Sequence, residues 1–188
     1  MFSIILPTYN RAAIIQDSIK SVIEQTYQYW ELIVVDDGST DNTEDCIKNL
    51  MLKENRIKYI YQHNQERSQA RNNGIKIAKY KWICFLDSDD IFLSNHLQTF
   101  YENIQNYPRI NFFYSLKERE EHIDFHNKHE TILINSIHSQ QVCLRKKILL
   151  ENTFNKKLNI GEDVELWMRI ACKEDLLCTN TETVKIIS

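Results

Sequence analysis

Three carboxylates lie within four positions directly after an apolar stretch. Asp87, Asp89 and Asp90 follow the run WICFL at 82–86, which is typical of a buried strand. Neighbouring carboxylates repel one another, so this crowding is costly unless a cation relieves it. Their oxygens suit hard divalent ions such as Mg²⁺ and Mn²⁺, which keep water and share substrate phosphates. The segment therefore predicts a metal-bound phosphate or diphosphate. The alternative is a loop in which Asp89 or Asp90 caps a helix near residue 94.

Two more polar clusters follow apolar runs in the same way. PTYN at 7–10 comes after FSIIL, and DDGSTD at 36–41 comes after ELIVV. Ligands of open α/β sheets bind beyond the carboxyl ends of the strands. Together with the cluster at 87–90, these segments predict one site at that edge. The alternatives are that Tyr9 is ordinary packing and that the aspartates before Gly38 serve only a turn.

The elements that would position these clusters alternate between strand and helix. Apolar runs predict strands at 2–6, 31–37, 57–61, 82–86 and 110–115. Helical periodicity predicts helices at 15–23, 68–79 and 94–106, and a capping box of Asp41 and Glu44 predicts the start of another. This alternation predicts an α/β fold with helices on both faces of the sheet and right-handed connections between parallel strands.

The second part of the chain carries weaker signals. Residues 116–130 are rich in charge without a clear period, 131–137 could be a strand, and 140–152 mixes strand and helix cues. Apolar residues at helical spacing predict a helix over 162–174. The run TVKIIS at 183–188 predicts a strand that stops abruptly, so we expect the natural protein to extend further.

The composition predicts a soluble globular protein. Of 188 residues, 43% are hydrophobic and 26% are charged, and the formal net charge is -3. This balance gives no general attraction to nucleic acid or to anionic membranes. No apolar run approaches the roughly 20 residues of a membrane helix, and the N-terminus lacks the features of a signal peptide. The five cysteines are scattered, so we expect reduced thiols in a cytoplasmic protein.

Two other kinds of site are disfavoured. Neither GxxxxGK[ST] nor GxGxxG occurs, and the chain has only three glycines. A nucleotide would therefore be held mainly by side chains and metal. His122, His126 and His129 have a spacing that suggests zinc, but no cysteine lies at metal-ligand spacing. We expect that segment to be a solvated charged face.

Four segments in series resemble the family 2 glycosyltransferases. They are SIILPTYNRAAIIQDSIKSVIEQTYQYWELIVVDDGSTDNT, ARNNGIKIA, WICFLDSDD and GEDVELWMRIA. The resemblance covers about 2–115 densely and 140–172 more sparsely. It implies the GT-A fold, in which a Rossmann-like nucleotide-binding half joins an acceptor half around a mixed, mostly parallel sheet flanked by helices. It also implies transfer of a sugar from a nucleotide diphosphate donor, a UDP-sugar, to a hydroxyl group with inversion.

The resemblance implies a role for each matching residue on the donor side. Pro7 and Tyr9 would line the nucleobase pocket, with Tyr9 stacking on the base. Asp37 would accept a hydrogen bond from the base ring. Asp87, with its neighbour Ser88, would contact the ribose or the sugar.

Further roles concern the metal, the diphosphate and the acceptor. Asp89 would bind Mn²⁺ or Mg²⁺, and Arg71 would lie near the diphosphate or order the metal loop. Asp163 would be the general base, with Glu162 beside it and Trp167 near the acceptor mouth. The alternatives are that Arg71 is a surface residue, that the two acids only favour a helix N-terminus, and that Trp167 is core. The family often has glycine-rich sequence before ARN, where this chain has NQERSQ.

The chemistry of sugar transfer explains why two acidic groups are needed. Negative charge builds on the leaving diphosphate, and a divalent cation stabilises it as a Lewis acid. The incoming hydroxyl is a poor nucleophile and needs a base on the opposite side. DSD and GED would supply these functions from about 75 positions apart, so the fold must bring them together.

The resemblance also implies an organisation and a set of partners. We expect one domain over 1–188, with a nucleotide-sugar-binding half at 1–115 and an acceptor-side half at 116–188 that ends early. The expected partners are a nucleotide-sugar donor and a saccharide or lipid-linked acceptor, without nucleic acid. Cytoplasmic location at the inner face of a membrane, through the acceptor, stays an open alternative.

Two other functions compete with the transferase. A sugar-phosphate nucleotidyltransferase would need a glycine-rich basic loop after the first strand, and PTYNRAA lacks it. A non-catalytic nucleotide-sugar-binding domain or an acceptor-incomplete fragment is favoured by the short C-terminal part. The presence of both Asp89 and Asp163 argues against it.

Overall fold

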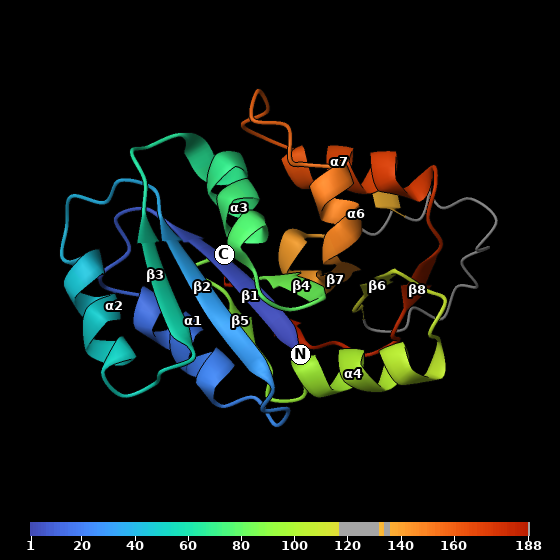
Figure 1. The fold of residues 1–188 in the computed structure, drawn as a ribbon, viewed down its shortest axis with the longest axis horizontal. Helices are drawn as coiled ribbons and strands as arrows, with labels where there is room; N and C mark the ends of the chain where they lie inside the picture. The colour runs from blue at the N-terminus through green and yellow to red at the C-terminus, as the bar shows by residue number, and fades with distance from the viewer. Residues whose placement is uncertain (117–131, 134–135, 188) are drawn as a thin grey trace.

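A central β-sheet organises the protein (Figure 1). The computed structural model describes residues 1–116, 132–133 and 136–187. Over these residues the sheet has seven strands in the order β3-β2-β1-β4-β7-β6-β8. The strands are β1 (Phe2–Thr8), β2 (Trp30–Asp36), β3 (Ile57–Tyr61), β4 (Trp82–Phe85), β6 (Phe112–Tyr114), β7 (Val142–Arg145) and β8 (Leu176–Cys178).

The pairing is parallel on one side and mixed on the other. β1 pairs in parallel with β2 and β4, and β2 pairs in parallel with β3. β7 is antiparallel to both β4 and β6, and β6 is parallel to β8. The predicted mixed, mostly parallel sheet is therefore confirmed. Since β7 comes from the second part of the chain and lies between β4 and β6, both parts share one continuous sheet.

Helices cover both faces of this sheet. They are α1 (Ile15–Ile23), α2 (Thr43–Met51), α3 (Glu66–Ile77), α4 (His96–Asn106), α6 (Lys146–Glu151), α7 (Glu162–Ala171) and the short η1 (Ser139–Gln141). None of the helices in the described part of the chain has both the length and the apolar character needed to cross a bilayer.

The core consists of two apolar layers. Alternate residues of β1 point to opposite faces: Phe2 and Ile4 join the layer under α1, α2 and α4, whereas Ile5 joins the layer under α3, α6 and α7. Every residue of β1 and β2 is buried. A strand covered on both faces is mostly apolar, which explains the apolar runs in the sequence, and the buried polar residues Ser3 and Glu31 hydrogen-bond to each other.

The close packing of α3 against β1 and β2 depends on Gly74. A Cβ atom added there would lie 2.6 Å from Ile5 Cγ2 and 3.3 Å from Val35 Cγ2. Real Cβ atoms essentially never approach another atom as closely as the 2.6 Å to Ile5 Cγ2. The small residue at this position therefore lets α3 lie close to β1 and β2.

Several predicted elements differ from the structure. The helix expected from the capping box begins at Thr43 with Asn42 as N-cap, while Asp41 accepts a hydrogen bond from Thr43 N at 3.0 Å. The strand predicted at 131–137 is wrong where the structure describes it, because Ile132 and Leu133 are helical. Residues 131, 134 and 135 lie outside the described residues.

Other segments were ambiguous or unpredicted. The segment 140–152 resolves into β7 followed by α6, so both of its cues have a structural basis. A second, two-stranded sheet pairs β5 (Ile91–Phe92) with β9 (Val184–Lys185), and only this part of the predicted strand at 183–188 is extended. The charged stretch at 117–130, with its three histidines, lies outside the described residues.

Candidate functional site

The polar clusters meet in one cavity at the carboxyl ends of β1, β2 and β4. The cavity has a volume of about 400 Å³. The residues predicted from the sequence that line it are Pro7, Tyr9, Asp37, Asp87, Ser88 and Asp89. This is the edge at which ligands of open α/β sheets bind. The expectation that segments from three separate strand ends form one site is met by the geometry.

The loop after β1 is fixed to the loop after β2. Asn10 N donates to Ser39 Oγ at 2.8 Å, and Asn10 Oδ1 accepts from Thr40 N at 2.8 Å. Asn10 itself has a left-handed φ of 53°, which asparagine tolerates better than most residues. The neighbouring Tyr9 is 47% exposed and faces the cavity, so it is not core packing.

The two aspartates after β2 have different surroundings. Asp36 accepts from Ser39 N at 2.8 Å and from the Tyr59 hydroxyl at 2.9 Å, which makes it a turn residue. Asp37 lines the cavity, and its Oδ1 accepts from Gln62 Nε2 at 2.7 Å and from Gln65 N at 2.9 Å. Among the described residues, Asp37 Oδ2 has no partner, so it is the atom available to a ligand.

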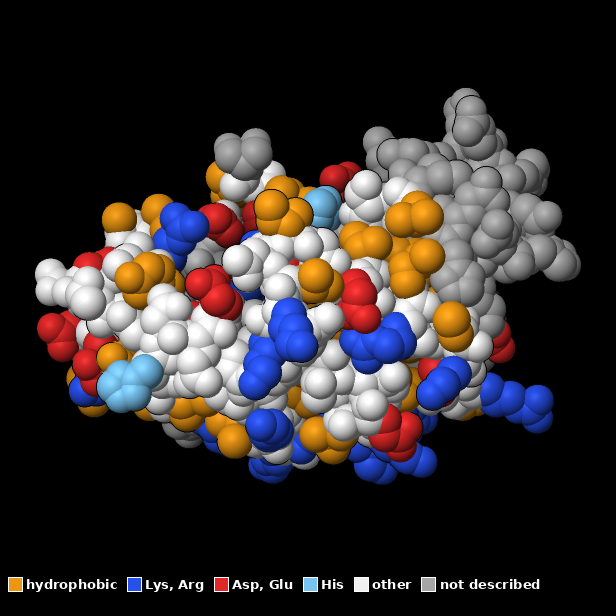
Figure 2. Space-filling view, turned by 90° about the horizontal axis from the view of Figure 1, so that it is seen from above, with side chains coloured by type: hydrophobic (Ala, Val, Ile, Leu, Met, Phe, Trp, Pro, Cys, Tyr) orange, Lys and Arg blue, Asp and Glu red, His pale blue; other side chains and the backbone are white. Residues whose placement is uncertain are grey.

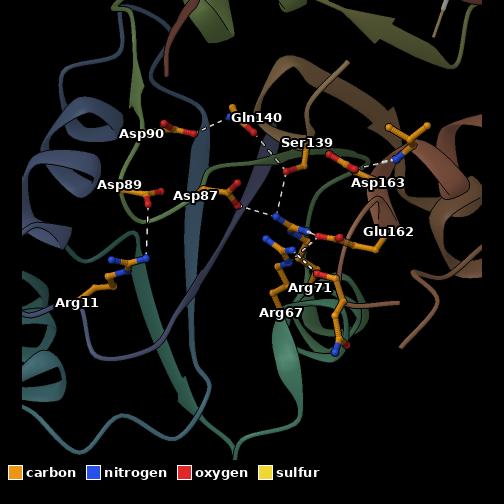
Figure 3. Close-up of polar contacts among 12 residues, drawn as sticks. Arg11, Arg67, Arg71, Asp87, Asp89, Asp90, Ser139, Gln140, Glu162 and Asp163 are labelled. Atoms are coloured by element: carbon orange, nitrogen blue, oxygen red, sulfur yellow. Dashed lines mark hydrogen bonds and ion pairs between the residues drawn. The ribbon is translucent and has the colours of Figure 1, made fainter. Parts of the chain in front are cut away.

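The three crowded carboxylates after β4 point to three different partners (Figure 3). Asp87 accepts from Arg71 at 2.7 Å, and Asp89 pairs with Arg11 at 3.6 Å. Asp90 is buried and accepts from the side chain of Gln140 at 2.6 Å and from a backbone amide of the C-terminal segment at 2.9 Å. Its pKa is raised to about 6, chiefly by burial. The repulsion anticipated from the sequence is thus relieved separately for each carboxylate, and only Asp87 and Asp89 face the cavity.

Arg71 joins the two acidic motifs from beneath the cavity (Figure 3). Its side chain is only 2% exposed. Its Nη1 donates to Glu162 at 2.8 Å, and its Nη2 donates to Asp87 at 2.7 Å and to Ser139 Oγ at 3.1 Å. Burial by itself lowers the pKa of Arg71, but Asp87 and Glu162 more than offset that and raise it. The interpretation of Arg71 as a surface residue is therefore wrong, and DSD and GED are joined by one side chain.

The second acidic motif opens helix α7. Gly161, the N-cap, has a φ of 72°, a left-handed conformation that glycine adopts at little cost. Glu162 is buried against Arg71, whereas Asp163 is half-buried and its Oδ1 lies 2.8 Å from Val164 N. Both acids lie in the first turn, where the helix dipole stabilises negative charge. Glu162 also bonds two arginines, so a favourable dipole is not its only role.

Trp167 does not lie at an acceptor mouth in this structure, which corrects the prediction. It is fully buried, its ring packs edge-on against Phe112 and Phe154, and its Nε1 donates to Ile137 O at 3.2 Å. One face of α7 belongs to the core, and the three- and four-residue spacing of Val164, Trp167 and Met168 marks that face.

Some cavity residues were missed by sequence reasoning. They are Thr8, Arg11, Asn64, Glu66, Arg67 and Asn159. Glu66 has a φ of 70°, a conformation that is costly for a residue with a side chain. This is the place where the resemblance led us to expect glycine-rich sequence, so the departure NQERSQ was the available signal.

The carboxylates of the cavity fit a divalent metal of the Mg²⁺ type. The described residues contain no group of three or more His, Cys, Asp or Glu side chains arranged to hold a metal ion. Mg²⁺ needs only one or two carboxylates when substrate phosphates and water complete its shell. Asp89 is 41% exposed at its side chain, and its present partner is the cation Arg11. The carboxylates of the cavity would thus supply part of the coordination shell of a metal ion, and substrate phosphates and water would supply the rest.

A second hollow is lined by residues that do not line the first. Its volume is about 510 Å³, and α3, the segment 153–157 and α7 line it. The charged residues around it are Lys76, Lys156, Lys157, Arg169 and Glu165. Figure 2 shows Lys and Arg side chains on the face of the molecule seen from above the view of Figure 1. This hollow is basic, in contrast to the carboxylate-rich cavity at the strand ends.

Comparisons with known proteins agree with the geometry. The model of the family described as "Glycosyl transferase family 2" matches residues 3–168. A glycosyltransferase of Rickettsia conorii is 33% identical over 204 residues, covering 98% of this chain and 32% of that protein. A GalNAc(5)-diNAcBac-PP-undecaprenol beta-1,3-glucosyltransferase of Campylobacter jejuni is 31% identical, covering 89% of this chain and 59% of its own length.

Solved structures share the fold at lower identity. TarS 1-349 of S. aureus in complex with UDP has a TM-score of 0.81 and 21% identity, covering 97% of this chain and 59% of that one. The mannosyltransferase PcManGT from Pyrobaculum calidifontis, in complex with GDP-Man and Mn²⁺, has a TM-score of 0.77 and 17% identity. This chain therefore spans about a third to three-fifths of the length of these proteins.

Proposed function

The chain belongs to the family 2 glycosyltransferases and has their GT-A fold, and we propose that it transfers a sugar from a nucleotide diphosphate donor to a hydroxyl group in glycan biosynthesis. The finer proposal is a UDP-sugar donor and inversion at the anomeric carbon. Support for uridine comes from the TarS complexes with UDP and UDP-GlcNAc. The Arg71 bridge is the observation that carries the proposal, because it holds Asp87 and Glu162 in one cluster.

Donor binding is assigned to the loops after β1, β2 and β4. Tyr9 stacks on the base beside Pro7, and the open oxygen of Asp37 accepts a hydrogen bond from the base ring. Asp87 and Ser88 contact the ribose or the sugar. These residues suit such roles because they line one cavity of about 400 Å³, a volume in the range of small-ligand pockets.

A divalent cation, Mn²⁺ or Mg²⁺, is assigned to Asp89, with Asp87 next to it. Such a cation stabilises the negative charge that develops on a leaving diphosphate. Supporting observations are the exposed carboxylate of Asp89 and its pairing with a cationic side chain. The role of Arg71 is then to fix the orientation of Asp87 from below.

Asp163 is the proposed general base. It takes the proton of the acceptor hydroxyl while the acceptor oxygen bonds to the anomeric carbon and the bond from that carbon to the diphosphate oxygen breaks. Attack from the side opposite the diphosphate inverts the anomeric centre. Asp163 suits this role because it is half-buried at the start of α7, adjacent to Glu162, which is held by Arg71.

The acceptor is proposed to be a saccharide, and a lipid-linked one is favoured by two relatives. The Escherichia coli relative WfgD and the Campylobacter jejuni enzyme are named for acceptors carried on diphosphoundecaprenol and PP-undecaprenol. We assign the acceptor side to residues 116–188 and the donor side to 1–115. With a lipid-linked acceptor, the protein would work at the cytoplasmic face of a membrane.

Calorimetric titration tests the donor site. UDP, GDP, CMP and dTDP are titrated with and without Mn²⁺ into the parent protein and into Asp89→Ala. We expect one nucleoside diphosphate to bind the parent protein only when Mn²⁺ is present. Asp89→Ala should lose this Mn²⁺-dependent binding. Absence of binding of all four nucleotides to a folded parent protein would reject the transferase proposal for this chain.

A second variant separates catalysis from binding. Asp163→Asn removes the base and leaves the cavity unchanged, so we expect nucleotide affinity to stay within about twofold of the parent. Turnover of the donor, measured as release of the nucleoside diphosphate, should fall by about 10²-fold or more. Binding without turnover in the parent protein itself would favour the alternative, a non-catalytic nucleotide-sugar-binding domain.

A further inference from the structure

Two arginines of α3 share one carboxylate. Glu162 Oε1 lies 2.8 Å from Arg71 Nη1 and 2.9 Å from Arg67 Nε. The two side chains differ sharply in exposure, because that of Arg71 is 2% exposed and that of Arg67 is 50% exposed. One guanidinium is therefore part of the protein interior, and the other borders solvent. Glu162 keeps a buried cationic partner even when Arg67 is elsewhere.

Arg67 is also one of the few cations of the donor cavity. Among the described residues that line the cavity, Arg11 and Arg67 are the only Lys, Arg or His side chains, against the carboxylates of Asp37, Glu66, Asp87 and Asp89. A diphosphate adds further negative charge to this set. Unless cations face it, binding a diphosphate here is opposed by like-charge repulsion.

The two arginines lie on either side of Asp87 (Figure 3). Arg11 is next to Asp89 on one side, whereas Arg67 lies in the cluster with Arg71 and Glu162 on the other. A metal ion on Asp89 neutralises charge only on the first side. The phosphate oxygens that face α3 then need a separate cation, and the buried Arg71 cannot reach into the cavity.

We propose that Arg67 binds the diphosphate of the donor, the contact that the sequence resemblance suggested for Arg71. The inference rests on the proposed function and deepens it by naming the residue that recognises the diphosphate. A guanidinium suits this task because its planar fork can donate two parallel hydrogen bonds to phosphate oxygens. Within the described part of the chain, the Nη1 group of Arg67 has no hydrogen-bond partner, so it can donate to a ligand without breaking an existing bond.

Arg67 also connects this contact to the segment before α7. Its Nη2 donates to the backbone oxygen of Asn159, which lines the cavity two residues before Gly161. The helix that carries Glu162 and Asp163 starts directly after. Arg67 is thus placed to bind the donor and to hold the connection between α6 and α7 that precedes the proposed base.

The experiment compares nucleoside diphosphates with the matching monophosphates. UDP with UMP, and GDP with GMP, are titrated in the presence of Mn²⁺ into the parent protein, Arg67→Gln, Arg67→Lys and Arg169→Gln. Arg169 is the matched control, because it also pairs with a glutamate on a helix and its side chain is 37% exposed, but it lies outside the donor cavity. Thermal unfolding of each variant checks that it is folded.

The expected result is a selective loss of diphosphate affinity. Arg67→Gln should bind UDP or GDP about tenfold or more weakly, while its affinity for UMP or GMP changes by less than about threefold. Arg67→Lys should lie between parent and Arg67→Gln, and Arg169→Gln should equal the parent. Equal diphosphate affinity in Arg67→Gln and parent, or equal losses for mono- and diphosphates, would overturn the inference alone. A folded parent that binds no nucleotide would overturn the proposed function together with it.

Discussion

Arg71 has an unusual position for a charged side chain, because it is completely enclosed between two acidic residues and Ser139. Removing a guanidinium from water is costly, and that cost is offset only when the surrounding groups satisfy its charge and its donors. Asp87, Glu162 and Ser139 do so for both terminal nitrogens, although the buried Nε has no partner. The network therefore depends on every member being present.

Replacement of Arg71 is expected to destabilise the fold as well as the site. Arg71→Ala leaves the buried Glu162 with only the half-exposed Arg67 as a cationic partner and removes the cation from Asp87, and breaking a buried ion pair costs about 3–5 kcal/mol. Chemical denaturation measures the free energy of unfolding. Arg169→Ala removes a surface pair and should cost about 0–1 kcal/mol. A loss below about 1 kcal/mol in Arg71→Ala would contradict this account of the network.

The sequence predicted the position of a site residue where that position depends on the residues next to it in the chain. Tyr9, Asp37, Asp87 and Asp89 directly follow strands, so their place at the sheet edge followed from local pattern. Asp90 could not be distinguished in this way, because its partners are 50 and 97 positions away. The same holds for the sharing of Glu162 by two arginines, which depends on tertiary packing.

At the scale of the elements, His96 anchors α4 to the C-terminal segment. It is fully buried, stacks on Phe92 with 3.7 Å between ring centroids, and is hydrogen-bonded through Nδ1 to Thr183 Oγ1 at 2.8 Å. Burial lowers the pKa of His96 from 6.5 to about 3. The folded protein therefore keeps this ring neutral over a pH range in which the unfolded chain protonates it.

Stability is expected to fall with acid because of this histidine. Between pH 6.5 and about 3, His96 is protonated in the unfolded state but not in the folded state. The contribution of the neutral His96 to the free energy of unfolding is therefore complete above pH 6.5 and is lost as the pH falls. From pH 7 to pH 5 the loss should be about 2 kcal/mol. Denaturation of the parent and of His96→Gln at both pH values measures it. The parent should lose about 2 kcal/mol more than the variant, and parallel losses would exclude His96 as the cause.

Elements with a clear period were predicted well, and short ones were not. The apolar spacing of α1 and the continuous apolar character of β1 and β2 match the structure. β8 has only three residues, all half-buried, and β5 has only two, of which Phe92 is buried, so neither is long enough for a period to be seen. The boundary between β7 and α6 falls between Arg145 and Lys146, where the surrounding residues suit both states.

For the molecule as a whole, ligand binding should appear as thermal stabilisation. A ligand that binds only the folded state at 100 times its dissociation constant stabilises it by about 2.7 kcal/mol. For a chain of this size, that corresponds to a rise in Tm of about 5–10 °C. The preferred nucleoside diphosphate with Mn²⁺ should cause this rise, and excess EDTA should abolish it. Asp89→Ala should not show this rise in Tm. An equal rise in Asp89→Ala would mean that the metal binds to residues other than Asp89.

The overall architecture was predictable in kind but not in strand order. Alternating strands and helices correctly predicted an α/β sheet covered on both faces. The insertion of β7 between β4 and β6 was not predictable, because its four residues carry no local sign of their partners. This insertion is what joins the first and the second part of the chain into one sheet.

The position of β7 also has a consequence for the order in which the protein can be completed during synthesis. β1, β2, β3 and β4 lie within the first 85 residues and can pair as the chain leaves the ribosome. The free edge of β4 must then wait for Val142–Arg145, almost 60 residues later. An unpaired edge strand is a template for pairing with other chains. Nascent chains that stall before Val142 would therefore carry an open edge in the middle of the future sheet, which makes them candidates for aggregation and for capture by chaperones.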